Sequence, residues 1–371
     1  MSSKILIEFE KVLQVVMTVL KVSIPTRSIS RRKLNTHPIK ESSMYKQRAN
    51  HIWMKISICV AIFASINCVF AQTNFPQKPV SLVVPYPAGA SVDAVARYIA
   101  EQLGNRLGQP VVVDNRGGAN GAIAMEYVAK APADGYTLIM ALDSQLSINP
   151  NLYSAIRYDP VKDFAPIMLV ATAPYVLFTN PQTGIKSVSD LIATARKPGK
   201  TINYTSSGVG SGGHLAAALL EGDSKVDMTH IPNKVTANAL RDVAENECQF
   251  LFITYASGKP LVDSGKLIPI AVSSPVRMKQ LPNLPTVGET LSGFQASATG
   301  GILAPARTPA HVVEKIRAEL EKIVTTPEFE KKLETFGMQS SSIGPDGYAK
   351  TISSDLAKWK KLIAERRISV N

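Results

Sequence analysis

Two glycine-rich stretches contain the residues that could bind a small anion. They are Pro85-Tyr86-Pro87-Ala88-Gly89-Ala90-Ser91 and Thr205-Ser206-Ser207-Gly208-Val209-Gly210-Ser211-Gly212-Gly213-His214. Each follows an apolar run typical of a strand and precedes a helical pattern, so a helix N-terminus would turn unpaired N–H groups outward. Neither stretch contains Lys or Arg. Backbone N–H groups, hydroxyls and water would therefore bind the anion, and two such loops predict a cleft between two lobes.

The second stretch also matches two enzyme motifs in part. Its glycines fit the G-x-G-x-x-G spacing of dinucleotide sites, but Asn233 stands about where that motif needs an acid. A nucleophile elbow around Ser211 would need Gly in place of Val209. His214, at helical spacing from Ser211, is better placed to order the loop than to act as a general base. These departures favour an anion-binding loop without a cofactor.

The other ionisable candidates have structural explanations. Asp93 lies where a helix starts, so it can accept backbone N–H bonds there, with direct ligand contact as the alternative. His230 ends an apolar strand, and His311 begins an exposed helical pattern. No group of His, Cys, Asp and Glu residues has metal-ligand spacing. The sequence therefore predicts neither a metal site nor a catalytic residue.

The elements that must position the loops alternate between short apolar runs and helical patterns. In the first half we expect strands at 80–85, 111–114 and 136–141 and helices at 93–107 and 121–131. Further on we expect strands at 166–171, 175–178, 201–204, 226–231, 249–253 and 267–272, with helices at 187–196, 213–220 and 235–246. Two proline-punctuated stretches follow, at 282–285 and 305–309, and past them only helices are expected, at 310–325, 327–336 and 347–365. The alternation predicts two α/β lobes with mostly parallel sheets, the last helices packing on the first lobe.

Composition and charge narrow the class of protein. With 371 residues, of which 45% are hydrophobic and 19% charged, the chain can bury the cores of about two domains. Its net charge of +12 is concentrated near the N-terminus, because the chain beyond Ala71 has 30 basic and 26 acidic residues, a net charge of +4. So small an excess argues against a nucleic-acid partner.

A secretory signal peptide is predicted at residues 54–71. Lys55 precedes an apolar run, and Val69-Phe70-Ala71 offers small residues at the cleavage point. The run is shorter than the ~20 apolar residues of a membrane span, so we expect the mature chain to begin at Gln72. Residues 1–53 are interpreted as a mis-assigned or disordered extension. Cys248 is then the only cysteine left, and no intrachain disulfide can form.

An ordered series of short motifs over residues 75–371 resembles the Bug family of periplasmic substrate-binding proteins, which serve tripartite tricarboxylate transporters. The series includes Pro85-Tyr86-Pro87-Ala88-Gly89, Ala133-Asp134-Gly135-Tyr136, Ile148-Asn149-Pro150, Asp163-Phe164-Ala165-Pro166, His230-Ile231-Pro232 and Leu284-Pro285-Thr286. The resemblance implies a two-lobed, type II Venus-flytrap fold with two crossovers. It places the first lobe at 72–172 and 299–371 and the second at 173–298, with crossovers near 170–173 and 298–302.

The resemblance also implies a set of ligand-binding positions. They are Ala88, Gly89, Ala90, Ser91, Asp93, Ser144 and Gln145 in the first lobe, and Ser206, Gly208, Gly210, Ser211, His214, Asn233 and Thr254 in the second. Three departures from the family pattern fall among them. The family commonly has Pro-Gly-Gly at 88–90, Tyr at Asn233 and an acid at Thr254. Loss of that acid predicts a ligand without a required ammonium group.

The function that the resemblance implies is capture of a small carboxylate or dicarboxylate in the periplasm and delivery to the membrane permease. The protein is then expected to be a monomer that lacks a cofactor and is not an enzyme. An exported α/β hydrolase-like enzyme and a periplasmic ligand sensor are the alternatives. A sensor would need a membrane span and a transcription regulator would need a helix-turn-helix, and neither pattern occurs after Ala71.

Overall fold

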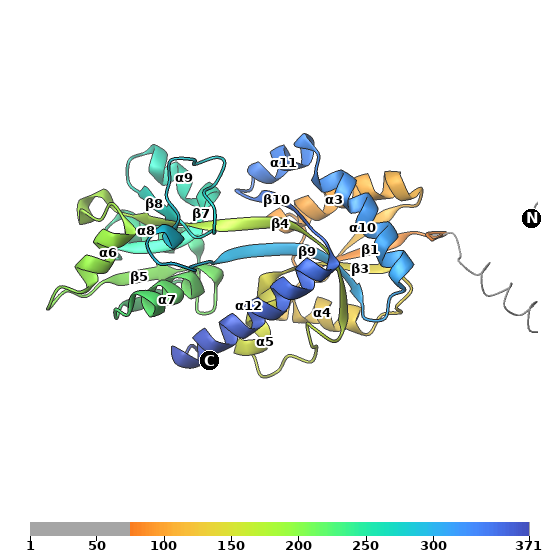
Figure 1. The fold of residues 1–371 in the computed structure, drawn as a ribbon, viewed down its shortest axis with the longest axis horizontal. Coiled ribbons are helices and arrows are strands. Elements are labelled where there is room, and N and C mark those ends of the chain that lie inside the picture. Colours follow the sequence, from red (N-terminus) through yellow and green to blue (C-terminus); the bar gives the residue numbers. More distant parts are fainter. Residues whose placement is uncertain (1–74, 371) are drawn as a thin grey trace, which may run out of the picture. The chain divides into compact units, whose positions relative to one another are not determined.

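The computed structural model describes residues 75–370, so the predictions for residues 1–53, for the signal peptide at 54–71 and for a start at Gln72 lie outside the described residues. The described chain is an α/β structure in two lobes, built on one curled sheet with the strand order β2-β1-β3-β9-β4-β7-β5-β6. β10 and β8 pair with β4 beside that path. Figure 1 shows helices against both halves of the sheet. The predicted two-lobed fold class is confirmed.

The first lobe is formed around parallel strands whose carboxyl ends meet at the cleft. Strand β1 (Val80–Val84) lies between β2 (Val111–Asn115) and β3 (Thr137–Leu142), parallel to both. Helix α3 (Ser91–Leu107) follows β1. Its helical pattern places Val95, Ile99 and Leu103 on one face, and that apolar face is buried. The short η1 (Ala119–Gly121) leads into α4 (Ala122–Ala129), and the π-turn η2 (Ser144–Ile148) leads from β3 into α5 (Asn149–Leu152).

The second lobe repeats this arrangement with different strands. β5 (Asn203–Ser206) lies between β6 (Thr229–Pro232) and β7 (Phe250–Thr254), again parallel to both. The helices are α6 (Val188–Ala195), α7 (Gly212–Ser224), α8 (Thr236–Ala244) and α9 (Tyr255–Asp263), with η3 (Pro181–Thr183), η4 (Val287–Glu289) and strand β8 (Ile268–Val272) completing the lobe. The glycine-rich stretch 205–214 therefore joins β5 to α7, as the sequence predicted.

Two long antiparallel strands connect the lobes. β4 (Phe164–Thr179) pairs with β9 (Ser297–Pro305) from Phe164↔Pro305 to Pro174↔Ser297, and then pairs with β7 from Tyr175↔Thr254 onward. β9 pairs with β3 on its other edge. The lobe boundaries at 172/173 and 298/299 fall within this paired stretch and stay a prediction.

The last quarter of the described chain corrects one expectation. Helices α10 (Ala310–Val324), α11 (Pro327–Glu334) and α12 (Pro345–Glu365) lie near their predicted positions. Between α11 and α12, however, the chain forms strand β10 (Gln339–Ile343), which pairs antiparallel with β4. The prediction of helices alone was wrong there. β10 reads Gln-Ser-Ser-Ser-Ile, so it lacks the apolar alternation that marks a strand.

Helix α12 packs on both lobes. Near its start, Tyr348 and Ile352 belong to a core cluster with Met125, Ile139 and other residues of the first lobe. Near its end, Trp359, Leu362 and Ile363 belong to the core cluster of the second lobe with β5, β7 and α7. Arg366, just past the helix, pairs with Glu221 of α7 at 3.3 Å. One continuous helix thus contributes to two cores, as its oblique course in Figure 1 illustrates.

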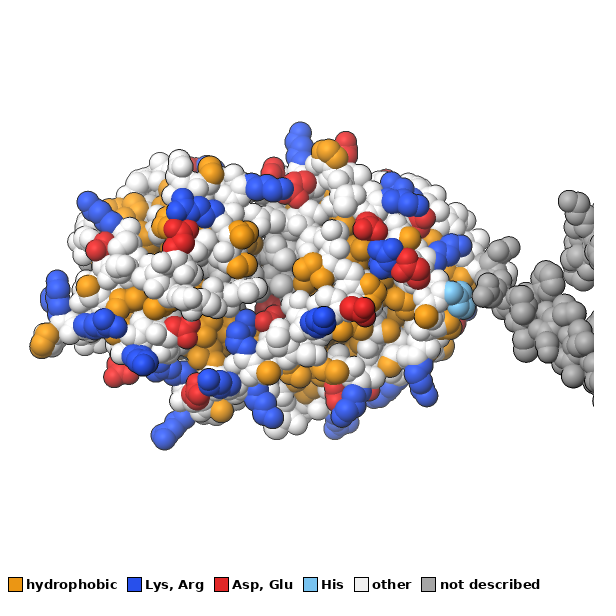
Figure 2. Space-filling model, viewed as in Figure 1, with side chains coloured by type: hydrophobic (Ala, Val, Ile, Leu, Met, Phe, Trp, Pro, Cys, Tyr) orange, Lys and Arg blue, Asp and Glu red, His pale blue; other side chains and the backbone are white. Residues whose placement is uncertain are grey.

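The outer surface has no single charged face in the view of Figure 2, where Lys, Arg, Asp and Glu side chains are scattered over both lobes. This agrees with the small net charge expected beyond Ala71. Within residues 75–370, no helix is both long enough and apolar enough to span a membrane.

Candidate functional site

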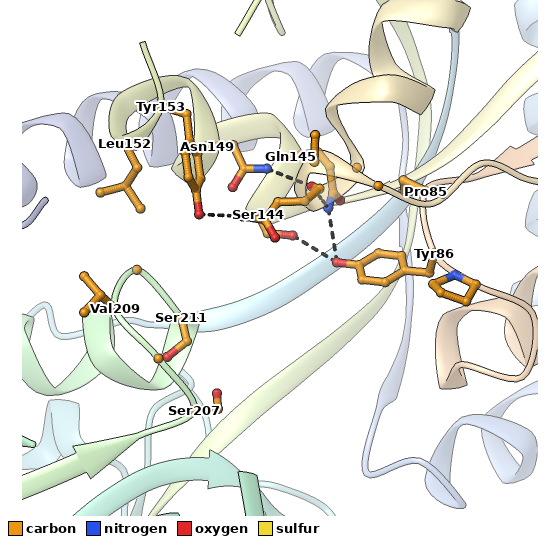
Figure 3. Close-up of a pocket in the computed structure, with 17 residues that line it drawn as sticks. Pro85, Tyr86, Ser144, Gln145, Asn149, Leu152, Tyr153, Ser207, Val209 and Ser211 are labelled. Carbon is orange, nitrogen blue, oxygen red and sulfur yellow. Dashed lines mark hydrogen bonds between the residues drawn. The ribbon is translucent and has the colours of Figure 1, made fainter. Parts of the chain in front are cut away.

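A cavity of about 590 Å³ lies between the lobes, where the two loops face each other across the gap (Figure 3). Its lining comes from the loops and short helices that follow strands of both lobes: Pro85, Tyr86, Pro87, Gly118, Ala119, Asn120, Gly121, Ser144, Gln145, Asn149, Leu152, Tyr153, Ser207, Gly208, Val209, Gly210 and Ser211. None of these described residues has a charged side chain. The cavity therefore offers hydroxyls, amides and backbone groups, together with a few apolar walls.

Side chains of η2 and of the loop after β1 form the first wall. Tyr86 Oη lies 3.2 Å from Ser144 Oγ, and Gln145 Nε2 donates to the same phenol oxygen at 3.1 Å (Figure 3). Gln145 is buried, and its Oε1 accepts the N–H of Leu142 at 3.0 Å. Each polar atom of that amide thus has a partner, which fixes the orientation of the Tyr86 and Ser144 hydroxyls at the cavity edge.

Asn120 also belongs to this wall and has a left-handed conformation, with φ 52°. Its carbonyl oxygen accepts from Gln145 Nε2 at 3.0 Å and from Asn149 Nδ2 at 2.9 Å. The side-chain amide nitrogen of Asn120, Nδ2, donates to the Tyr153 hydroxyl. The next residue, Gly121, has φ +88°, and a Cβ there would lie 2.9 Å from atoms of Gln145 and Pro85, so only glycine fits.

The second wall is mainly backbone. Gly208 and Gly210 both have positive φ, at +132° and +76°, and a Cβ on Gly210 would overlap the Leu152 side chain of the first lobe. Ser211 caps α7 by accepting the N–H of His214 at Oγ, 3.3 Å away. The cavity side of this loop therefore consists of glycine backbone, Val209 and two serines at the N-terminus of a helix, a position that favours anions.

Two histidines lie behind that loop, of which His214 is buried and His230 is half-buried. Their rings stack with centroids 3.8 Å apart and planes 9° apart. Burial lowers the pKa of His214 to about 3, with a smaller contribution from His230, and burial lowers the pKa of His230 to about 4. Both rings are therefore neutral at physiological pH.

One carboxyl group lies close to the first wall without lining the cavity. Asp143 directly precedes Ser144, and its Oδ1 accepts the N–H of Thr299 on β9 at 3.3 Å. Burial, and next the nearby Asp355 of α12, raise the pKa of Asp143 to about 7. Asp143 thus links the first wall to the crossover strand β9 by a hydrogen bond and lies near the like charge of Asp355 on α12.

Five of the fourteen predicted ligand positions line the cavity: Ser144, Gln145, Gly208, Gly210 and Ser211. The other nine are outside the lining: Ala88, Gly89, Ala90, Ser91, Asp93, Ser206, His214, Asn233 and Thr254. Direct contact of any of the fourteen with a ligand stays a prediction.

Several of the nine already have intramolecular partners. Asp93 accepts the N–H of Gly89 at 2.9 Å and also bonds Arg97 and Asn115, in keeping with the structural role expected for it rather than with the alternative of ligand contact. Asn233 donates to Thr205 and Asp242, and Thr254 bonds Ser257 at 2.9 Å. These contacts shape the loops from outside the cavity.

Sequence reasoning missed the residues that complete the first wall: Tyr86, Asn120, Asn149 and Tyr153. Two of them lie in motifs that the resemblance rests on, Pro85-Tyr86-Pro87 and Ile148-Asn149-Pro150. Asn120, between glycines at 117, 118 and 121, could have been recognised as a turn residue tolerant of positive φ. No group of three His, Cys, Asp or Glu side chains that could hold a metal occurs among residues 75–370.

Two lobes, a cavity at the strand ends and residues from both sides define a bilobal binding protein. Residues 95–368 match the tripartite tricarboxylate transporter family receptor, and the chain belongs to that family. A relative from Pseudomonas sp. (strain P51), the protein in the tcbD-tcbE intergenic region, is 34% identical over 80% of this chain and 89% of its own length. The protein BugT of Bordetella pertussis is 28% identical over 81% of this chain and 93% of its own.

Solved structures agree with this assignment. R. palustris Rpa4515 with adipate is 33% identical with a TM-score of 0.65 and covers 80% of this chain and 99% of its own. MatC from Rhodopseudomonas palustris with bound malate is 28% identical with a TM-score of 0.62 and covers 78% of this chain and all of its own length. The periplasmic binding protein BugD is 30% identical with a TM-score of 0.61, and it covers 80% of this chain and 99% of its own.

Proposed function

We propose that this protein captures a small carboxylate or dicarboxylate in the cleft between its lobes and delivers it to the permease of a tripartite tricarboxylate transporter. The observation that carries the proposal is the cavity itself, which combines hydroxyls, amides and glycine backbone from both lobes at strand carboxyl ends. Membership of the receptor family supports the proposal, as do the similar structures of Rpa4515 with adipate and of MatC with bound malate.

The ligand carboxylate is expected to accept hydrogen bonds from the hydroxyls of Tyr86, Ser144 and Ser211 and from N–H groups at the start of α7. Hydrogen bonds to a charged group contribute roughly 1.5–3 kcal/mol each, so a few of them suffice without a cationic side chain. Gln145 and the glycines at 208 and 210 complete the contact set. The remaining predicted positions would act through the shape of the loops.

The finer parts of the proposal follow the family. The protein acts in the periplasm after cleavage of residues 54–71, is a monomer and catalyses no reaction. Intact mass of material recovered from the periplasm would test the cleavage, with Gln72 as the expected first residue. Recovery of residues 1–53 on the exported protein would contradict both the signal and the start-site interpretations.

A thermal-shift screen of the mature protein tests the binding function. We expect adipate, malate or another small carboxylate to raise the melting temperature, because a ligand of the folded state adds RT ln(1 + [L]/Kd) to stability. Acetamide and succinamide are matched uncharged controls. If no mono-, di- or tricarboxylate raised the melting temperature at millimolar concentration, the proposed function would be wrong.

The chemistry of the cavity further favours a ligand without an ammonium group. Among the described residues, no Asp or Glu lines it, so a buried ammonium would have no anionic partner there. We therefore expect succinate to bind more tightly than aspartate, measured by isothermal calorimetry. Tight binding of aspartate with no binding of succinate would refute this preference.

A further inference from the structure

Two backbone hydrogen bonds to side chains outside the cavity hold the glycine loop of the second lobe, residues 207–211, in its conformation. The N–H of Gly210 donates to His214 Nδ1 at 3.0 Å. The N–H of Gly208 donates to Ser206 Oγ at 3.2 Å, and that oxygen lies 2.8 Å from His230 Nε2. Each of the two left-handed glycines in the cavity wall is thus tied, directly or through one serine, to one of the stacked histidines.

These contacts define the protonation of both rings. Because His214 Nδ1 accepts the Gly210 N–H, its single proton must be on Nε2. Ser206 directs its only hydroxyl proton to the Gly208 carbonyl at 3.0 Å, so His230 Nε2 supplies the proton in its own bond with that oxygen. A protonated His214 would have no acceptor for Gly210, and two stacked cations would repel each other.

The surroundings of the pair favour the neutral state. Tyr204 of β5 stacks on His230 at 4.9 Å and on His214 at 6.2 Å, and burial holds its pKa well above the usual range. Glu221 of α7 is paired with Arg366, and Tyr175 of β4 lies against Gly212. No carboxylate therefore faces either imidazole to stabilise a positive charge among the described residues.

We propose that His214 and His230 are positioning residues that act as a neutral stacked pair, His214 fixing Gly210 and His230 fixing Gly208 in the conformation that receives the ligand. This inference rests on the proposed function for its effect on affinity. Its geometric part concerns the loop alone and can be tested without any ligand.

The ligand-independent test is amide hydrogen exchange by NMR on the mature protein. His214→Phe keeps the ring but removes the Nδ1 acceptor, so exchange at Gly210 should become at least about 10-fold faster with little change at Gly208. His230→Phe should affect Gly208 and spare Gly210. His214→Asn places an amide oxygen near the position of Nδ1 and should restore slow exchange. Replacement of the exposed His311 by Asn is the matched control.

Affinity is measured on the same variants with adipate and malate as probes. His214→Phe should weaken binding about 3- to 10-fold, as expected for loss of one neutral hydrogen bond, and His214→Asn should recover most of it. Equal losses in the Phe and Asn variants, or unchanged Gly210 exchange in His214→Phe, would overturn the proposal. If neither probe bound the wild type while the exchange pattern appeared, the pair would be supported and the proposed function would be wrong.

Imidazole ¹⁵N spectra of the wild type provide a test that needs no variant, in case His214→Phe does not fold. Both rings should show the Nε2–H tautomer with no titration between pH 5 and 8. A proton on Nδ1 of His214, or an inflection for either ring near pH 6.5, would overturn the proposal.

Discussion

The two walls of the cleft achieve the same polarity by different means. In the first lobe, side-chain hydroxyls and amides point at the cavity and are oriented by the fully bonded amide of Gln145. In the second lobe, backbone faces the cavity, and its shape depends on two left-handed glycines with histidines behind them. We therefore expect ligand binding to survive the loss of one polar atom from the first wall. Binding should not survive a side chain added to the glycines of the second wall.

The strongest test of this difference is Gly210→Val. The substitution imposes a side chain on a residue with φ +76° and pushes it into Leu152 of the opposite lobe, so we expect at least about a 100-fold loss of adipate or malate affinity by calorimetry. Gly184→Val is the control, because Gly184 has φ +72° but open space around it, away from the cavity. It should lower stability and leave affinity unchanged. Equal affinity losses in both variants would mean that backbone strain, not closeness to the cleft, matters.

Ionisable groups beside the two walls should also affect the pH dependence of folding stability with opposite signs. The pKa of Asp143 is raised to about 7, so its burial costs folding free energy that grows as pH rises from about 4 to 7, on the order of 1.4 kcal/mol for each pH unit in that range. Asp143→Asn should therefore stabilise the protein at pH 8, and the gain should vanish near pH 4.

For the histidines the sign is reversed. Their folded-state pKa values of about 3 and 4 lie below that of an unfolded histidine, so the unfolded chain binds protons first. The free energy of unfolding therefore decreases as pH falls from about 6.5 toward 4. His214→Asn should reduce that acid-side loss. Urea denaturation from pH 4 to 8 measures both effects, and the same pH trend in the two variants would contradict the contrast between the walls.

Ser211→Ala is expected to have the next largest effect on binding. Its hydroxyl caps α7 and faces the cavity, so loss of one hydrogen bond to a charged group should cost about 1.5–3 kcal/mol, or roughly 10- to 150-fold in affinity. Loss of the cap should lower stability by about 1 kcal/mol as well. Ser187→Ala removes a comparable cap from α6 outside the cavity, so it should lower stability alone. Normal binding by Ser211→Ala would remove this residue from the site.

Tyr86→Phe should have a smaller effect, because Ser144 and Gln145 remain in place and Gln145 Nε2 keeps its bond to the Asn120 carbonyl. We expect about a 3- to 10-fold loss of affinity in calorimetry, with little change in melting temperature. Tyr127→Phe, on the exposed face of α4, is the matched control. A loss as large as that of Gly210→Val would show that the first wall is no more tolerant than the second.

Lys234→Ala should have the smallest effect, below about 2-fold. Lys234 follows Asn233 near the cleft but is exposed and does not line the cavity. Elimination of binding by this change, with normal binding by Gly210→Val and Ser211→Ala, would mean that a side-chain charge holds the ligand and that the site is misplaced.

The sequence predicted the fold better than the site because periodicity reports burial and not the partners of polar atoms. The helical face of Val95, Ile99 and Leu103 and the β5–loop–α7 unit were visible in the pattern. β10 and the merging of two predicted strands into β4 were not, because both depend on pairing with a distant strand.

The predicted site residues followed the glycine motifs, and the outcome differed between the lobes. The glycines at 208 and 210 line the cavity, whereas Ala88 to Ser91 lie outside its lining. Tyr86 and Asn120 instead reach it through a network that joins residues up to 59 positions apart. Such contacts depend on the tertiary fold and leave no short-range signal in the chain.

Helix α12 has a kinetic consequence. Because Tyr348 and Trp359 belong to the cores of different lobes, the lobes cannot separate far unless the helix tilts or one of its ends leaves its core. Opening should therefore be a small, fast excursion most of the time, and full release of a bound molecule should require a rarer event that breaks the pair between Arg366 and Glu221. We accordingly expect the residence time of the ligand to be governed partly by a helix that never touches it.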